Sequence, residues 1–249
     1  MDIKVVSLQK NRVLSVSNYS KEEKEKFLTE YLQSALGLKI IVKDYFLTEE
    51  IYDKVDYLCI DEAYRLVIVE KRYGKDSRTI KSGLMFIDFI KENISKIKML
   101  IGDKIGVDVI KDICFDCRLV ILTESFTHYD YSSIKSLPYT IEAINYAFID
   151  KNLIFVKEYQ NKKNEFIYYN GMRSSLYLEL ENFLLSLGED VSIFGYRNVI
   201  TVRKIKAFMF IIVDANSLIL YINNKEYIID NYDKLNKILD KVEKAYDEN

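Results

Sequence analysis

The chain has 249 residues, of which 49% are hydrophobic and 30% are charged, and its formal net charge is −2 at pH 7. This length and composition exclude a disordered chain and suffice for one large globular domain or two modest ones. The slightly acidic balance excludes a protein that coats nucleic acid by bulk positive charge, although a local basic patch is compatible with it.

The sequence gives two indications about location in the cell. Residues 1–18 alternate apolar and polar positions and lack the basic start, apolar core and small-residue cleavage site of a signal peptide. The most apolar later stretch, residues 207–222, contains Asp214 and Asn216 and is shorter than the roughly 20 apolar residues that span a bilayer. We therefore expect a soluble cytoplasmic protein without a membrane partner.

The first part of the chain contains both helical and strand-like apolar patterns. Ser20 and Glu23 form a capping-box signature ahead of apolar residues at helical spacing. In chain order the predicted elements are two short strands within 3–16, a helix at 20–37, a strand at 38–47, a hairpin at 56–72, a helix at 79–100, a strand at 117–125, a helix at 134–146 and a strand at 152–159. This order predicts a mixed α/β domain.

A polar and aromatic stretch at residues 159–171 interrupts the apolar pattern and predicts a domain boundary. We expect a first domain at 1–160 and a smaller α+β domain at 165–249. The predicted elements of the second domain are a helix at 176–187, a pair of strands within 198–223 and a terminal helix at 234–246.

Several chemistries can be excluded from residue counts. Three cysteines are too few for a disulfide framework, and Cys114 and Cys117 form a Cys-x-x-Cys with no second pair for zinc, so we interpret them as reduced core cysteines. The single histidine, His128, excludes a site built from two imidazoles of one chain. No glycine-rich phosphate loop or dinucleotide fingerprint is present. Carboxylates must therefore carry any catalytic chemistry.

The hairpin DYLCIDEAYRLVIVEKR, residues 56–72, places two of these carboxylates far from its turn. Strand alternation puts Glu70 and Arg72 on one face and Lys71 on the other, with Asp56 a near neighbour of Glu70. Two adjacent carboxylates repel each other unless they are protonated or bridged by a cation, and such oxygen ligands suit Mg²⁺ or Mn²⁺. The alternative is that they are solvated strand ends, or that Glu70 pairs with a neighbouring basic residue.

The stretch KVDYLCIDEAYRLVIVEKRYGKDSRTIKSGLMFIDFI, residues 54–90, resembles the metal-binding hairpin and following helix of the PD-(D/E)XK, or restriction-endonuclease-like, nucleases, and more narrowly a bacterial group of these proteins. The resemblance covers about residues 1–160 and implies a mixed sheet flanked by helices. Residues 181–222 resemble a small domain of unknown function that often follows this unit, with Arg203, Lys204 and Phe208 at the places of its basic pair and phenylalanine.

The resemblance implies roles for individual residues of the hairpin. Asp56 and Glu70 match the metal-binding aspartate and glutamate of the family. Arg72 stands where the family has lysine; it can clamp a phosphate but does not readily lose a proton. A bulge that turns Lys71 inward, or an amine from Lys81 on the next helix, would restore a lysine.

Other positions depart further from the family pattern. Ser82 replaces the helix glutamine, and Lys21 stands near the place of the first-helix glutamate. Three glutamates lie close to Lys21 in sequence: Glu22, Glu23 and Glu25. The expected nucleic-acid-binding residues are Lys71, Lys75, Arg78, Lys81 and Ser82; the basic ones among them would otherwise form an ordinary exposed face.

Three hypotheses follow from these patterns. The first is a Mg²⁺- or Mn²⁺-dependent endonuclease acting on DNA, or alternatively RNA, with Asp56 and Glu70 holding the ion and Arg72 or a nearby lysine contacting the phosphate. The second is a degenerate nuclease fold that binds nucleic acid without cutting it. The third is a protein-interaction module that uses the second domain. A homodimer is an expectation by analogy with nucleases that cut both strands.

Overall fold

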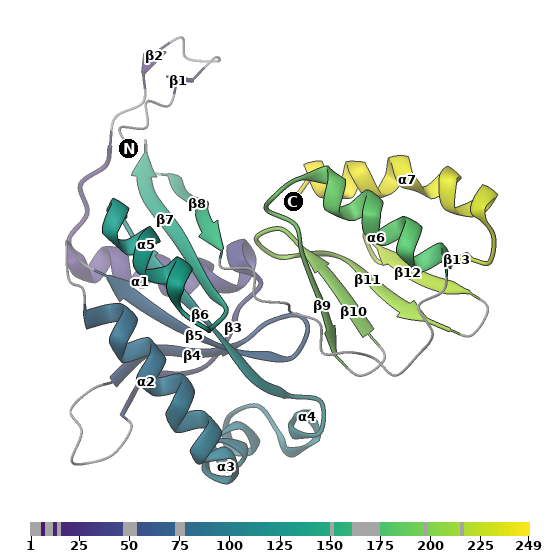
Figure 1. The fold of residues 1–249 in the computed structure, drawn as a ribbon. Helices are drawn as coiled ribbons and strands as arrows, with labels where there is room; N and C mark the ends of the chain where they lie inside the picture. The colour runs from purple at the N-terminus through teal and green to yellow at the C-terminus, as the bar shows by residue number, and fades with distance from the viewer. Residues whose placement is uncertain are drawn as a thin grey trace. The chain divides into compact units, whose positions relative to one another are not determined.

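The computed structural model describes residues 6–7, 12–13, 16–46, 54–72, 78–149, 152–160, 175–196, 199–214 and 217–249. The chain divides into two compact units, Met1–Asn161 and Lys162–Asn249. Each unit combines helices with its own sheet (Figure 1). The mixed α/β class expected from the sequence is confirmed.

The first unit is built on a six-stranded mixed sheet of order β3-β4-β5-β6-β7-β8. Its strands are β3 (Lys39–Phe46), β4 (Lys54–Ile60), β5 (Arg65–Arg72), β6 (Cys114–Thr123), β7 (Ile141–Ile149) and β8 (Asn152–Gln160). The pairs β5–β6 and β6–β7 are parallel and the others are antiparallel. Near the N-terminus β1 (Val6–Ser7) pairs with β2 (Arg12–Val13). The predicted meander of three strands is therefore β3-β4-β5.

Helix α1 (Lys21–Leu36) begins and ends at the residues that the sequence indicates. The hydroxyl of Ser20 accepts a hydrogen bond from the amide of Glu23, whose carboxylate accepts one from the amide of Ser20. Gly37 ends the helix in the left-handed conformation, with φ 67°. The buried leucines of α1 recur at helical spacing: Leu28, Leu32 and Leu36. They hold α1 against one face of the sheet.

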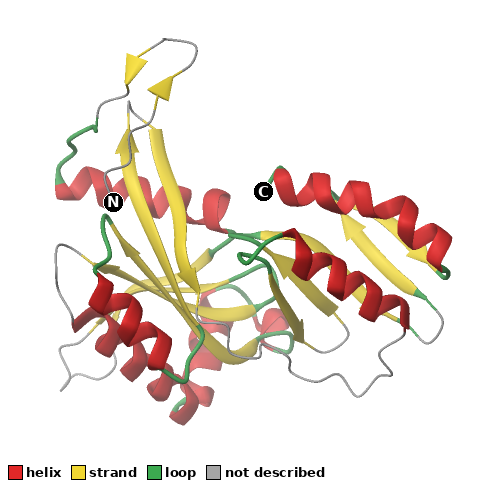
Figure 2. Cartoon of the chain, turned by 45° about the horizontal axis from the view of Figure 1, so that its top comes forward, coloured by secondary structure: helices red, strands yellow, loops and turns green. Residues whose placement is uncertain are grey.

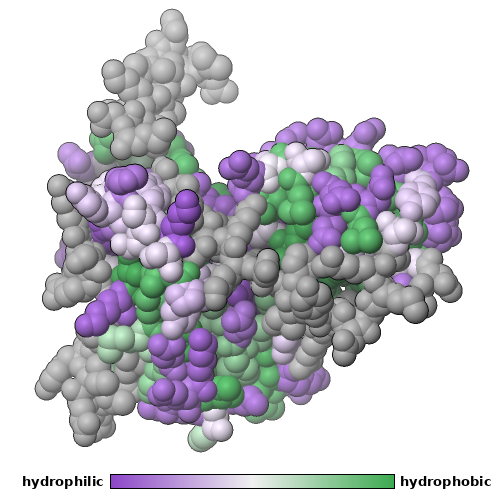
Figure 3. Space-filling model, viewed as in Figure 1, coloured by the Kyte–Doolittle hydropathy of each residue, from purple (hydrophilic) through white to green (hydrophobic). Residues whose placement is uncertain are grey.

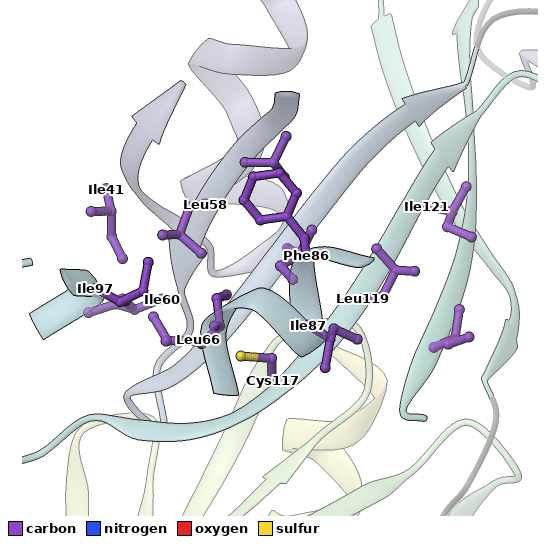
Figure 4. Packing of buried hydrophobic residues seen from close by; sticks show 14 of the residues in the cluster. Ile41, Leu58, Ile60, Leu66, Phe86, Ile87, Ile97, Cys117, Leu119 and Ile121 are labelled. Carbon is purple, nitrogen blue, oxygen red and sulfur yellow. The ribbon is translucent and has the colours of Figure 1, made fainter. Parts of the chain in front are cut away.

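The other face of the sheet is covered by α2 (Arg78–Glu92), α3 (Ile94–Lys104) and α5 (His128–Ser136), with the short α4 (Val107–Ile110) beside α3 (Figure 1). Alternate residues of the hairpin, among them Leu58, Ile60 and Leu66, pack there against Phe86 and Ile87 of α2 (Figure 4). The hairpin therefore has one face toward α1 and the other toward α2, as its alternation predicts.

The helix predicted at 79–100 is two helices. Asn93 separates α2 from α3, with φ −120° and ψ 35°, and its side-chain amide donates to the carbonyl of Phe89 at 3.0 Å. This local hydrogen bond offers the backbone an alternative to a continuous helix, which is why asparagine favours helix ends.

The prediction of a helix at 134–146 is wrong. Thr127 and Asp130 form a capping box that starts α5 at His128, and the helix has ended before Pro138. The residues after it form the parallel strand β7, in which seven of nine residues are buried. Strands buried on both faces lack strict alternation, so an apolar run of this kind is easily taken for a helix.

The second unit is an antiparallel sheet of order β13-β12-β11-β10-β9 with two helices. Its elements are α6 (Ser175–Leu187), β9 (Ser192–Tyr196), β10 (Val199–Arg203), β11 (Ala207–Val213), β12 (Leu218–Ile222), β13 (Lys225–Ile229) and α7 (Tyr232–Asp247). Both helices pack on one face of the sheet (Figure 2). The pair of strands expected within 198–223 is three strands, because the turn at Lys204–Lys206 divides the first apolar run.

Hydrophobic side chains reach the surface over α6 (Figure 3). Leu178 and Leu185 are 40% and 51% exposed and, being seven residues apart, share one side of the helix. Within the described residues, no helix combines the length and the apolar character needed to span a lipid bilayer.

Candidate active site

The carboxylate of Asp56 lies where β4 and β5 stop pairing through their backbones. The ladder between these strands runs from Ile60 and Leu66 to Tyr57 and Val69. Beyond it, the amide of Lys71 donates to Oδ2 of Asp56 at 2.7 Å. A side-chain carboxylate thus takes the place of a ladder carbonyl, which fixes it at the end of the hairpin.

The ammonium group of Lys71 lies between two carboxylates on the α1 face of the sheet. Its Nζ is 2.8 Å from Oε1 of Glu25 and 3.4 Å from Oδ1 of Asp56. It also lies 4.8 Å from the ring centroid of Tyr57, a cation over an aromatic face. The Lys71 side chain is only 4% exposed, against 19% for Asp56 and 41% for Glu25. We call Glu25, Asp56, Tyr57 and Lys71 the Lys71 cluster.

Tyr57 forms the floor of the Lys71 cluster. It is fully buried, and its hydroxyl lies 2.9 Å from Oγ1 of Thr29 on α1. Burial raises the pKa of Tyr57, and the bond to Thr29 and the charge of Lys71 offset this only in part. The phenol therefore stays neutral at ordinary pH, and the positive charge of the cluster belongs to Lys71.

Arg72 points to the face of the sheet opposite to Lys71. Its Nη1 lies 2.6 Å from Oδ1 of Asp130 on α5, and its guanidinium carbon lies 5.9 Å from the ring centroid of Phe126. Burial alone would raise the pKa of Asp130, but hydrogen bonds from Arg72 and Thr127 outweigh it and lower that pKa. Arg72 is thus committed to an ion pair that ties β5 to α5.

Glu70 is buried, with 5% exposure, and pairs in register with Ile121 of β6. The β4–β5 ladder ends at Tyr57 and Val69, next to Asp56 and Glu70 in the sequence, and strand alternation turns the Glu70 side chain to the Arg72 face of β5. Mg²⁺ is usually held by one or two protein carboxylates together with substrate phosphates, so two carboxylates suit the ion in number and chemistry. In the described part of the chain, no group of three or more histidine, cysteine, aspartate or glutamate side chains is placed to hold a metal.

Paired charges surround the Lys71 cluster. Lys24 of α1 lies 2.5 Å from Glu124, which follows β6, and Lys54 lies 2.5 Å from Asp44. The hydrogen bond from Lys54 lowers the pKa of Asp44. These pairs are partly exposed and contribute little to stability.

The remaining predicted residues lie on or before α2. The side chain of Lys81 is exposed and that of Ser82 is half-buried. Arg78 begins α2, but its side chain, like the whole of Lys75, lies outside the described residues. The structure therefore unites Asp56 with Lys71 and places Arg72, Lys81 and Ser82 in other environments.

Sequence reasoning did not assign roles to Glu25 and Asp130. Glu25 is one of three glutamates that lie close to Lys21 in the sequence, and which of them faces the hairpin depends on the angle at which α1 crosses the sheet. Asp130 had a local signal, because Thr127 and Asp130 have the spacing of a capping box.

Comparison of the chain with protein-family models, with curated proteins and with solved structures finds no match. The residues and their geometry are therefore the basis on which a function is inferred.

Proposed function

We propose that the chain is a metal-dependent nuclease of the restriction-endonuclease-like class, with Lys71 rather than Arg72 as its active-site lysine. The observation that carries the proposal is the position of Asp56, which is bonded to the amide of Lys71 at 2.7 Å and lies 3.4 Å from its ammonium group. The order of helix, meander, helix and parallel strand in the first unit is compatible with that class.

Asp56 and Glu70 are the residues that would hold Mg²⁺ or Mn²⁺. When bound, such an ion polarises a phosphoryl oxygen and lowers the pKa of a coordinated water. Asp56 is fixed for this task by the Lys71 amide, and Glu70 by its place in a buried strand.

Lys71 supplies the positive charge that the phosphate requires. Its ammonium group can donate to a non-bridging phosphate oxygen, and charge-assisted bonds of this kind are the stronger ones. Glu25 is the more exposed of its two carboxylate partners, so Glu25 is the group that a substrate phosphate displaces. Asp56 remains in place because it also accepts from the Lys71 backbone.

The second candidate is a degenerate nuclease fold that binds nucleic acid without cutting it. The observation in its favour is the commitment of Arg72 to Asp130 at 2.6 Å, which takes the residue at the family lysine position out of the site. Under this alternative Lys71 stays paired with Glu25, and no substrate phosphate displaces that carboxylate.

The test is cleavage of plasmid DNA, single-stranded DNA and RNA with Mg²⁺ or Mn²⁺. We expect cleavage by the native protein, DNA being preferred, and its loss in Asp56→Asn, Glu70→Gln and Lys71→Met. Lys91→Met is the matched control, because this lysine is 52% exposed on α2. Arg72→Lys should not raise activity, since it stays paired with Asp130. A folded native protein that cuts none of the substrates, or cleavage that survives Lys71→Met, would refute the proposal.

A further inference from the structure

A cavity of about 310 Å³ lies between α1 and the β7–β8 hairpin, within the first unit. Five of its eight lining residues are aromatic: Tyr19, Phe27, Tyr31, Phe148 and Phe155. Its volume is at the lower end of the range for ligand sites, which suits one small ring system better than a large ligand.

The aromatic wall is held rigid by its own contacts. The ring centroids of Tyr19 and Phe27 are 5.1 Å apart at an interplanar angle of 71°, and those of Tyr19 and Phe148 are 5.1 Å apart at 66°. Phe27 and Phe148 are 5.9 Å apart, so each ring touches the other two. Edge-to-face packing of this kind pre-forms the cavity before a ligand binds.

The lining also carries polar groups at its open side. Tyr31 is 43% exposed and brings a phenol oxygen, and Asn152 brings an amide whose nitrogen donates to the carbonyl of Ile149 at 3.2 Å. Lys157 follows Phe155 by two residues and therefore lies on the same face of β8. The site thus offers flat apolar faces, hydrogen-bonding edges and a neighbouring cation.

These three features match a nucleotide. A base is a flat ring with a polar edge, and its phosphate is complementary to lysine. A lipid chain would use neither the polar edge nor the aromatic faces, which nucleic-acid-binding proteins use to stack unpaired bases.

The cavity and the Lys71 cluster lie on the same helix. Glu25 and Thr29 mark the flank of α1 that contacts the cluster, whereas Phe27, Tyr31 and Ala35 line the cavity. From residue 25 to residue 31 the helix rises about 9 Å, and the two sites lie on different flanks of α1, so a strand that joins them must cross the helix.

We propose that this cavity binds an unpaired base of a single-stranded nucleic acid whose backbone crosses α1 to the Lys71 cluster. The inference rests on the proposed nuclease function and deepens it, because it makes single strands, or strands opened near the cut, the substrate class. A base held in the cavity fixes which phosphate reaches Lys71.

The test is fluorescence anisotropy of labelled oligonucleotides in EDTA, so that binding is measured without cleavage. We expect Tyr31→Ala to weaken binding of single-stranded DNA about 5- to 150-fold, the effect of losing one stacked base. Tyr31→Trp should restore the affinity, since it returns an aromatic face. Tyr129→Ala is the control, because Tyr129 is an 83% exposed tyrosine on α5 and should leave affinity unchanged.

An oligonucleotide with abasic sites separates base contacts from backbone contacts. We expect it to bind the native protein weakly and to be insensitive to Tyr31→Ala. Equal binding of the intact strand by the native protein and by Tyr31→Ala and Phe155→Ala would overturn the inference, as would an equal loss for duplex and abasic DNA. Binding of free nucleosides alone would also overturn it.

The same assay distinguishes failure of the two proposals. If the native protein binds single-stranded DNA through Tyr31 but cuts no substrate, the base-binding inference stands and the proposed nuclease function is rejected. If cleavage depends on Lys71 but is unchanged by Tyr31→Ala, the nuclease function stands and the base-binding inference is rejected.

Discussion

The two ends of β5 each carry an acid–base–acid triad on the α1 face of the sheet, and the triads differ in their access to solvent. Near the start of β5, Arg118 lies 3.2 Å from Asp61 and 3.0 Å from Glu142. The three side chains are 2%, 5% and 1% exposed, respectively. Near its end, Lys71 is equally buried, but its partners Glu25 and Asp56 are partly exposed.

This difference in exposure determines whether the cation of a triad can change its partners. Removing ions from water is costly, and a closed triad recovers that cost only by keeping all of its partners. An open triad has carboxylates that water can solvate, so its cation can change partners. The closed triad therefore serves the fold, whereas the open one is suited to binding an anion.

The largest effect is expected from breaking the closed triad. Arg118→Met should lower the free energy of unfolding by about 3–5 kcal/mol, because it removes a buried cation that pairs with two buried carboxylates. Urea unfolding at pH 7 measures the change. Adding Glu142→Gln should recover part of the loss, and Lys91→Met should change stability by less than about 0.5 kcal/mol. A loss below about 1 kcal/mol would remove the contrast between the two triads.

An effect of about 3 kcal/mol is expected from Asp130→Asn, which removes the carboxylate that pairs with the buried Arg72 at 2.6 Å. The lowered pKa of Asp130 means that its contribution is present above the ordinary value of 3.8 and is lost as the pH falls through the lower folded pKa. The difference between native and variant should therefore shrink below about pH 4. Unfolding at pH 7, 5 and 3 measures it, and a constant difference would contradict this linkage.

A smaller effect on stability is expected at the open triad. Lys71→Met should cost about 1 kcal/mol or less, because Glu25 and Asp56 retain access to water. The same variant should abolish the nuclease activity that we propose. Urea unfolding measured beside the cleavage assay would separate the two roles, and a loss near that of Arg118→Met would make this triad structural as well.

The smallest effect concerns the thiols. Burial raises the pKa of Cys59 and Cys117 to about 12, so the native protein should react negligibly with a thiol reagent between pH 7 and 9. Arg118→Met should accelerate labelling of Cys59 by loosening the region around it. Rapid labelling of the native protein would show that the closed end opens readily.

Local patterns predicted the parts of the fold that local interactions determine. The capping box and Gly37 located α1, and strand alternation assigned Lys71 and Arg72 to opposite faces. The prediction failed at β7, where an apolar run carries no periodicity to separate strand from helix.

Whether Lys71 or Arg72 is the basic residue beside Asp56 could not be predicted from the sequence, for a different reason. It depends on partners that come from distant elements: Asp130 from α5 holds Arg72, and Glu25 from α1 holds Lys71. The spacing of residues within the hairpin does not predict these contacts. Strand geometry gives the direction of a side chain, whereas its chemistry depends on what lies in that direction.

Every residue of β5 is buried, from Arg65 to Arg72. Such a central strand should be among the slowest segments to exchange its amide hydrogens, and substitutions in it should be tolerated poorly. The side chains of Glu25 and Tyr31, on two flanks of α1, are partly solvated and can vary at lower cost. Sequence changes among descendants of this chain should therefore accumulate on the helix, while the strand beneath it stays the same.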